Sequence, residues 1–144
     1  MYLVDTDVIS ELRKKERADP RVVAFFRRAA TRDVPLYLAA VTVGELRRGV
    51  ELVRHRRDLR QAALLDRWLE GVLAEYGECV LPFDADAAQV WGRLRVPHAE
   101  NPLDKQIAAT ALLYDLTLVT RNVRHFASTG ARLLDPFAAD VDQP

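Results

Sequence analysis

Short apolar runs alternate along this chain with longer segments in which apolar residues recur every three or four positions. Five short, mostly apolar runs lie at 2–4, 36–41, 79–81, 116–119 and 132–134 and are typical of strands buried on both faces. The clearest helical spacing lies at 58–76, where Leu65, Leu69 and Val72 belong to one apolar stripe. This alternation predicts an α/β fold: a three-layer α/β/α sandwich around a central, mainly parallel sheet.

Capping residues mark where several of the helices begin. Asp19 followed by Pro20 predicts one helix start, and Thr42 predicts another directly after the second strand. Asp84 is expected to cap a helix that runs to Leu94, and a further helix opens at 101–102 with Asn and Pro. In open parallel sheets, ligands bind beyond the carboxyl ends of the strands, so that edge is where chemistry is expected.

Length and composition favour one folded domain. The chain has 144 residues, 49% hydrophobic and 29% charged, and we predict a single domain at 1–136 followed by a short C-terminal tail at 137–144. Asp5 follows closely after the start, and no apolar run approaches the ~20 residues of a membrane span, so neither a signal peptide nor a membrane association is expected. Cys79 is the single cysteine, so no internal disulfide forms, and a cytoplasmic location is expected.

The charge is balanced overall but unevenly distributed. With 21 basic and 21 acidic residues the net charge is zero, so the whole molecule has no strong attraction for nucleic acid. Six arginines nevertheless lie within 47–60 against two acids, Glu51 and Asp58, and a smaller basic excess lies at 13–17. Two interpretations stay open for these segments: solvated helix faces, or contacts to a nucleic-acid backbone.

Polar side chains with oxygen atoms follow several of the predicted strands. Asp5 and Asp7 come after the first strand, Glu45 lies shortly after the second, and Asp104 opens the helix that begins at 101–102. Thr120, Arg121 and Asn122 follow the fourth strand. Ionised carboxylates brought together repel one another unless a cation compensates them, and oxygen ligands without His or Cys favour Mg²⁺ or Mn²⁺.

Each of these acids also has an ordinary structural interpretation. Thr42 and Glu45 have the spacing of a capping box, and residues 101–104 form nearly the same motif with Asp104 in the acidic position. Asp7 is expected to cap a helix that begins at Val8. Asp5 is harder to explain in this way, because an Asp at the end of a buried strand loses hydration without an evident local partner.

Four segments, in order, resemble one known family. They are YLVDTDVIS at 2–10, VTVGELRRG at 41–49, NPLDKQIAATA at 101–111 and LVTRNVRHF at 118–126. Together they resemble the PIN-domain ribonucleases, specifically the VapC-type toxins of bacterial toxin–antitoxin pairs. The resemblance covers nearly the whole chain, and the order and spacing of the four segments make it specific.

The resemblance implies a set of site residues. Asp5, Glu45 and Asp104 correspond to the acidic centre, and Asn122 stands at the fourth position, where the family often has Asp. The implied ligands of Mg²⁺ or Mn²⁺ are Asp5, Asp104 and Asn122, with Glu45 acting through a water molecule. The residues expected around them are Asp7, Thr120 and His125, and the expected RNA contacts are Arg47, Arg48, Arg54, Arg56 and Arg57.

The implied activity is hydrolysis of RNA by a water molecule, which leaves a 5′-phosphate and a 3′-hydroxyl. The resemblance also implies a homodimer that a cognate VapB-type antitoxin holds inactive. The segment 58–76 and the Arg-rich helix before it are the expected surfaces for both partners.

Three other functions fit parts of the sequence. A PIN nuclease for housekeeping RNA processing, and a PIN-like module that binds RNA or a partner without cutting, share the same motifs. The opening Asp5-Thr6-Asp7-Val8 also fits haloacid-dehalogenase-like phosphatases. That family needs a Lys after the later hydroxyl residue, and no Lys follows Thr120, since the last one is Lys105.

Overall fold

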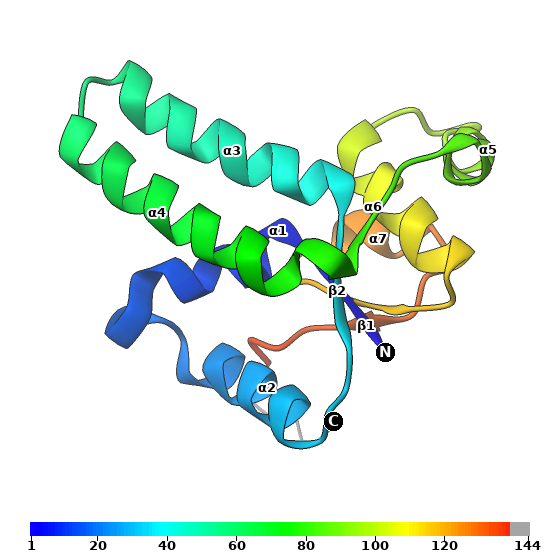
Figure 1. Cartoon of the computed structure of the whole chain (residues 1–144). Coiled ribbons are helices and arrows are strands. Elements are labelled where there is room, and N and C mark those ends of the chain that lie inside the picture. Colours follow the sequence, from blue (N-terminus) through cyan, green and yellow to red (C-terminus); the bar gives the residue numbers. More distant parts are fainter. Residues whose placement is uncertain (139–144) are drawn as a thin grey trace.

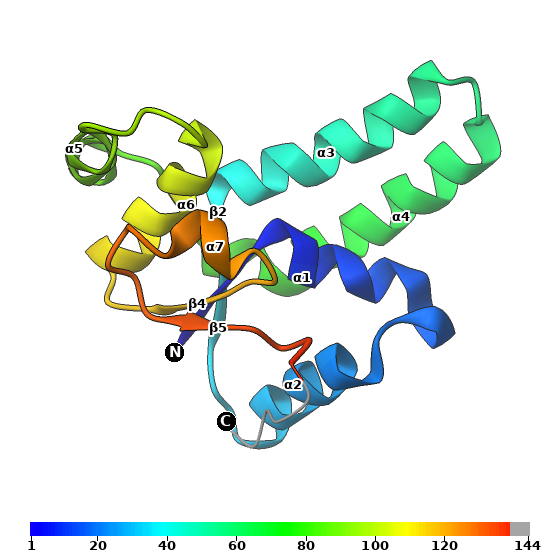
Figure 2. The same ribbon diagram turned by 180° about the vertical axis from the view of Figure 1, so that it is seen from behind.

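Five parallel strands form the centre of the molecule, in the order β3-β2-β1-β4-β5. The computed structural model describes residues 1–138. The strands, in chain order, are β1 Tyr2–Val4, β2 Leu36–Ala39, β3 Val80–Leu81, β4 Thr117–Val119 and β5 Leu133–Leu134. Helices cover both faces of this sheet (Figures 1 and 2), so the predicted α/β/α sandwich is confirmed.

The helices connect and cover the strands. The α-helices are α1 Thr6–Glu11, α2 Pro20–Thr31, α3 Ala40–His55, α4 Leu59–Tyr76, α5 Ala85–Leu94, α6 Pro102–Leu113 and α7 Val123–Phe126. Two 3₁₀ segments, η1 Leu12–Arg17 and η2 Gly77–Cys79, follow α1 and α4. α3 and α4 form a long hairpin that extends away from the sheet, and α5 lies on the opposite side of the molecule (Figure 1).

Neighbouring residues of each strand face opposite layers, because side chains alternate along a strand. Val4, Leu38 and Val119 belong to the core cluster that packs against α1, α2, α3 and α4. Leu3, Ala39 and Leu118 belong to the other cluster, with Ile107 of α6 and Phe126 of α7. This alternation explains why the strands contain apolar residues at nearly every position: both faces are covered.

The strand order places a switch point between β1 and β4. From β1 the chain moves outward through β2 and β3 on one side, and through β4 and β5 on the other. Val4 of β1 lies opposite Val119 of β4, so both strands end at the same level. The residues that follow them, beginning with Asp5 and Thr120, therefore meet at one edge of the sheet.

Most element boundaries agree with the sequence pattern to within one or two residues. β2 ends at Ala39 and α3 begins at Ala40, two residues earlier than the predicted start at Thr42. Cys79 ends η2 and is half-buried, so it does not belong to the third strand. β4 and β5 each lack the first predicted residue, and the four-residue β2 is shorter than the apolar run.

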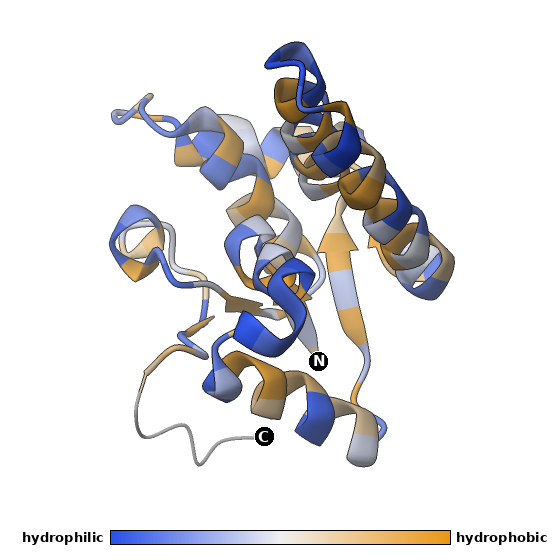
Figure 3. Cartoon of the chain, turned by 90° about the vertical axis from the view of Figure 1, so that its left-hand side faces the viewer, coloured by the Kyte–Doolittle hydropathy of each residue, from blue (hydrophilic) through white to orange (hydrophobic). Residues whose placement is uncertain are grey.

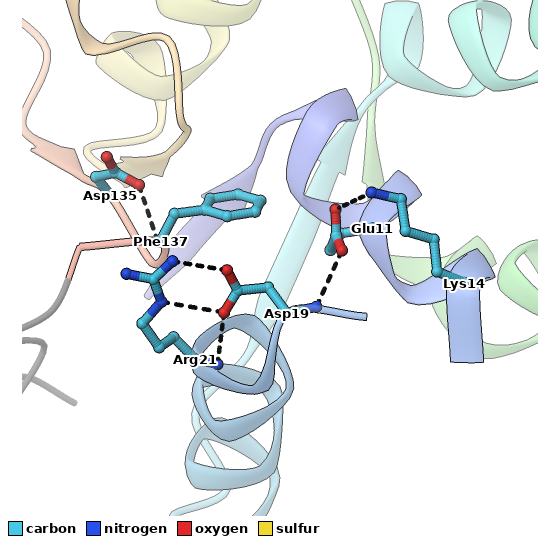
Figure 4. A network of polar contacts seen from close by, with 6 residues as sticks. All are labelled: Glu11, Lys14, Asp19, Arg21, Asp135 and Phe137. Carbon is cyan, nitrogen blue, oxygen red and sulfur yellow. Dashed lines mark hydrogen bonds and ion pairs between the residues drawn. The ribbon is translucent and has the colours of Figure 1, made fainter. Parts of the chain in front are cut away.

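The predicted tail at 137–144 is described only at its first two residues. Phe137 is 7% exposed and packs in the first core cluster, and its N–H donates a 2.9 Å hydrogen bond to Asp135 (Figure 4). Residues 139–144 lie outside the described part of the chain. The domain boundary at 136 stays a prediction.

A polar network ties the two ends of η1 together (Figure 4). Glu11, which is 7% exposed, accepts hydrogen bonds from the Lys14 Nζ at 2.8 Å and from the Asp19 backbone N–H at 2.9 Å. Asp19 caps α2 and pairs with Arg21, whose Nη2 lies 2.7 Å from Asp19 Oδ2. Residues 12–17 are therefore held as a fixed turn between α1 and α2.

Candidate active site

Asp5 lies at the switch point and is 4% exposed. Its N–H donates to the Val119 carbonyl at 2.9 Å, which joins the ends of β1 and β4. Its carboxylate accepts two hydrogen bonds of 2.8 Å, from the Thr6 N–H and from the Thr120 hydroxyl. Asp5 is thus the N-cap of α1, and the expectation that it lacks a local partner is wrong.

The environment of Asp5 makes its carboxyl harder to ionise than a carboxyl in water. Burial raises its pKa most strongly, and the negative charge of Asp104 raises it further. The hydrogen bonds from Thr120 and Thr6 act in the opposite direction without cancelling this effect. No cationic side chain of the described residues pairs with Asp5, so its charge is left for something outside the chain to compensate.

Glu45 and Asp104 lie within electrostatic reach of Asp5. Glu45, on α3, is half-buried; burial raises its pKa, as do the charges of Asp5 and Asp104, while Arg48 lowers it. Asp104 lies in the first turn of α6, and its Oδ2 is 2.9 Å from Nδ1 of His125 on α7. Three acids from three separate parts of the chain therefore interact at one edge of the sheet.

The capping interpretations of these acids are wrong. α3 begins at Ala40, so Thr42 lies inside the helix, where its buried hydroxyl accepts from the Thr6 hydroxyl at 3.3 Å. Asn101 makes no side-chain cap hydrogen bond, and its φ of 53° lies in the left-handed region. Glu45 and Asp104 therefore have no capping role in their helices.

Asp7 also differs from its predicted role as a helix cap. It lies inside the first turn of α1, and its Oδ2 accepts from the Arg121 N–H at 3.1 Å. Its Oδ1 is buried and has no hydrogen-bond partner among the described residues. Burial and the charge of Asp5 raise the pKa of Asp7 to about 7. A buried oxygen without a partner is uncommon in folded proteins and needs a ligand or water to satisfy it.

The residues after β4 complete the edge. Thr120 is fully buried, and its hydroxyl donates to Asp5 and accepts from the Asn122 N–H at 3.0 Å. The exposed side chain of Asn122 makes no hydrogen bond within residues 1–138. Thr120 thus fixes the Asp5 carboxylate while the Asn122 amide oxygen stays available to a ligand.

Thr6 and Thr42 are site residues that the sequence analysis missed. Thr6 donates its N–H to Asp5 and its hydroxyl to Thr42, and it lines the same hollow as Glu45. The signal was present in the sequence, because Thr6 stands between the two acids Asp5 and Asp7. Its contact with α3, however, depends on tertiary packing that local patterns do not contain.

The donor chemistry at this edge suits a hard divalent cation. The groups that meet there offer carboxylate, hydroxyl and amide oxygens, which are the ligands of Mg²⁺ and Mn²⁺. Among residues 1–138, no three side chains of the His, Cys, Asp and Glu types come close enough together to form a metal-ligand group by themselves. A set of two carboxylates, Asp5 and Asp104, with the Asn122 amide is compatible with that finding, because it needs only two acids.

The five arginines expected to contact RNA have two different environments. Arg47 and Arg54 each lie 3.1 Å from Asp66 of α4 and also pair with Glu51, so their charges are largely compensated within the α3–α4 hairpin. Arg48, Arg56 and Arg57 make no ion pair with a described residue. Arg54 follows Glu45 by nine residues, or about 13 Å along a helix that rises 1.5 Å per residue.

Comparison with known proteins identifies the family. The sequence model of the PIN domain family matches residues 2–131. The chain belongs to the PIN domain family. This PIN domain is 33% identical to Toxin FitB of Neisseria gonorrhoeae over 95% of its own length and 99% of the relative. It is 34% identical to the VapC ribonuclease Y4jK of Sinorhizobium fredii, over 95% of its own length and 98% of the relative.

A solved structure supports the same assignment. The crystal structure of FitAcB from Neisseria gonorrhoeae matches this PIN domain with a TM-score of 0.81 and 32% identity, over 95% of this chain and 99% of the other. Family membership excludes the haloacid-dehalogenase-like phosphatase, as does the absence of a Lys after Thr120. None of the described helices is both long and apolar enough to span a membrane.

Proposed function

We propose that this PIN domain is a metal-dependent ribonuclease that acts as the toxin of a toxin–antitoxin pair. The observation that supports this most is the meeting of Asp5, Glu45 and Asp104 at the switch point without a cationic partner for Asp5. The similarity to a VapC ribonuclease and to Toxin FitB supports the same conclusion.

Asp5, Asp104 and Asn122 would hold Mg²⁺ or Mn²⁺, with Glu45 acting through a water molecule. The ion, when bound, supplies positive charge that stabilises the transition state at the phosphate. Thr120 would keep the Asp5 carboxylate in one orientation through its 2.8 Å hydrogen bond. His125 would fix Asp104 in the same way, and Asp7 would lie just outside the ligand set.

Glu45 would orient the attacking water and accept its proton. Burial, and then the charges of Asp5 and Asp104, raise the pKa of Glu45 toward neutral pH. A carboxylate with a higher pKa is a stronger base and accepts a proton more readily. Attack by an external water leaves a 5′-phosphate and a 3′-hydroxyl. Of the predicted RNA contacts, Arg48, Arg56 and Arg57 would approach the phosphate backbone with uncompensated charge, whereas Arg47 and Arg54 would first have to leave their ion pairs.

The protein partners follow from the resemblance to VapC-type toxins. A VapB-type antitoxin would cover the site, and a second copy of the chain would form the homodimer, with α3 and α4 as the surfaces for both. A cytoplasmic location fits this role. A PIN nuclease for RNA processing would have the same site, so the expected growth arrest on expression distinguishes the toxin.

Cleavage of RNA by the purified protein tests the proposal. We expect it to cut a mixed-sequence RNA in Mn²⁺ or Mg²⁺ and to stop when EDTA is added. Mn²⁺ should also raise the thermal unfolding midpoint at pH 7, because it binds the folded site, and Asp104→Asn should abolish both effects. An intact RNA together with no Mn²⁺-dependent shift would favour a PIN-like module that binds without cutting. The feature that favours such a module is Asn122, which is neutral where the family often has Asp.

A further inference from the structure

A hollow of about 290 Å³ extends from the candidate site between α1, α3 and α4. Thr6 and Glu45 line its inner part, and Leu46, Val50 and Trp68 are among its apolar walls. Arg13 also lines it, at the end where α1 passes into η1. Of the candidate acids, Glu45 borders this hollow, so a groove leads away from Glu45 along α1.

A second hollow of about 560 Å³ continues this groove between η1 and α4. Arg13, Gln61, Leu65 and Trp68 line both hollows, so the two are contiguous. The second hollow is strongly basic, with one acid against five bases among its lining residues: Arg13, Lys14, Lys15, Glu16, Arg17 and Arg67. The ribbon between α1 and α2 is correspondingly hydrophilic (Figure 3).

Four of these five bases have no partner for their charge among the described residues. Lys14 is paired with Glu11, but Arg13, Lys15, Arg17 and Arg67 make no ion pair with a described residue and are exposed. This contrasts with the α3–α4 hairpin, where Asp66 and Glu51 compensate Arg47 and Arg54. Both clusters are therefore partly neutralised: Arg47 and Arg54 in the larger one, and Lys14 alone in the smaller one at 13–17.

The basic surface is also held in place. Glu11 joins Lys14 to the Asp19 N–H and so fixes both ends of the segment that contains Lys15 and Arg17 (Figure 4). Cationic side chains spaced along a groove on a held backbone suit an extended polyanion, whose phosphates repeat along its length. Trp68, which lines both hollows, offers an apolar surface for a base between them.

We propose that single-stranded RNA reaches the candidate acids along this groove, with its phosphates on Lys15, Arg17 and Arg67 and with Arg13 at the junction of the two hollows. The inference rests on the proposed ribonuclease function and assigns a path to its substrate. It makes the η1–α4 groove, defined by these four residues, a stronger RNA contact than Arg47 and Arg54 of the hairpin, whose charges are compensated.

Charge reversal in the groove tests this. The double variant Lys15→Glu/Arg17→Glu is compared with a matched double variant on α2, Arg27→Glu/Arg32→Glu, whose residues are exposed and lie outside the groove. Both are made in the Asp104→Asn background and titrated against a fluorescein-labelled, mixed-sequence RNA of about 12 nucleotides. We expect the groove variant to bind at least about tenfold more weakly. Its log–log salt slope should fall by about 1.4, since each lost phosphate contact on single strands is worth about 0.7.

Both double variants are also made without the Asp104→Asn change, and their cleavage kinetics test the RNA path separately from the proposed function. An increase in KM with little change in kcat for the groove variant alone supports the path. RNA that is cut by wild type, with equal binding and KM in the two double variants, overturns the path and leaves the nuclease intact. If wild type neither binds nor cuts RNA, the proposed function fails. If the groove variant loses binding to polyglutamate but not to RNA, the groove is a protein-binding surface and the inference is wrong.

Discussion

Two acidic networks lie close together in this molecule, and their carboxylates behave in opposite ways. Asp5 is buried beside Asp104 and Glu45, and its pKa is raised by burial and by the charge of Asp104. Burial also acts to raise the pKa of Glu11, but hydrogen bonds from Lys14 and the Asp19 N–H outweigh it and lower that pKa. Glu11 has a cation within reach, whereas the donors to Asp5 among residues 1–138 are all neutral.

The difference indicates that Glu11 stabilises the folded protein, whereas Asp5 lowers its stability. The Glu11 network satisfies its own charge and fixes the η1 turn, so it needs nothing from outside. The acids at the switch point repel one another and leave an oxygen of Asp7 without a partner. Such uncompensated charge is typical of functional sites, where residues needed for activity often lower the stability of the folded protein.

The largest expected effect is on cleavage. Asp5→Asn should lower the rate of RNA cleavage by at least about 100-fold, because it removes a carboxylate from the charge that would hold the ion. Glu11→Gln, a matched change of a buried acid, should keep the wild-type rate at saturating RNA to within a few-fold, while its KM should rise because Glu11 holds the segment of Lys15 and Arg17. Initial rates on the same RNA in Mn²⁺ measure both. Equal losses in the two variants would mean that the networks do not differ in function.

A smaller loss is expected from Thr120→Val, which keeps the shape of the side chain and removes the hydroxyl that holds Asp5. Changes of this kind cost about 10- to 100-fold in metal affinity or activity. The concentration of Mn²⁺ that gives half-maximal cleavage should rise. Thr129→Val offers a control with another buried threonine, far from the acids in the chain. An unchanged Mn²⁺ requirement in Thr120→Val would remove Thr120 from the site.

For the free energy of unfolding we expect the opposite order: the change at Glu11 should cost more than the change at Asp5. Glu11→Gln is expected to cost about 1–3 kcal/mol of unfolding free energy, because it breaks a charged pair and weakens a hydrogen bond to a buried acceptor. Asp5→Asn in EDTA should cost less than Glu11→Gln or increase stability, since the amide still accepts from Thr6 and no longer repels Asp104. Urea unfolding at pH 7 measures both, and the reverse order would contradict the comparison.

The smallest expected effect is a pH dependence at Asp19. The hydrogen bond and charge of Arg21 lower the pKa of Asp19 to about 2, from an ordinary 3.8. Above pH 3.8 the carboxylate is ionised in both the folded and the unfolded chain, so its contribution to stability is fully present. As the pH falls from 3.8 toward 2, the unfolded chain takes up a proton first, and that contribution is lost. The urea midpoints of wild type and Asp19→Asn should therefore converge over this range and differ by a constant amount from pH 5 to 7.

Local signals in the sequence were sufficient for much of the fold. α2, α4 and α5 begin where Asp19, Asp58 and Asp84 cap them, because each Asp accepts from its own helix. The five apolar runs predicted the five strands, and the candidate site lies beyond the carboxyl ends of the strands, as expected for ligand sites of open parallel sheets. The presence of Asp5, Glu45 and Asp104 at one edge followed from the same reasoning.

The remainder depends on contacts that no local pattern contains. α3 begins at Ala40 without a side-chain cap hydrogen bond, and in its first turn Thr42 accepts a hydrogen bond from Thr6 of α1. Arg47 and Arg54 are paired because α4 returns alongside α3 and brings Asp66 to them. Glu11 has no sequence signal for its role, because its partner is a backbone N–H eight residues later.

The bond between Thr120 and Asp5 joins residues that are 115 positions apart. Contacts so distant in the chain form late, and a protein leaving the ribosome acquires its N-terminal elements first. Asp5 after β1 and Glu45 on α3 are synthesised before β4, so the orientation of the Asp5 carboxylate waits for Thr120. The proposed ribonuclease would therefore stay inactive on a nascent chain until β4 has left the ribosome.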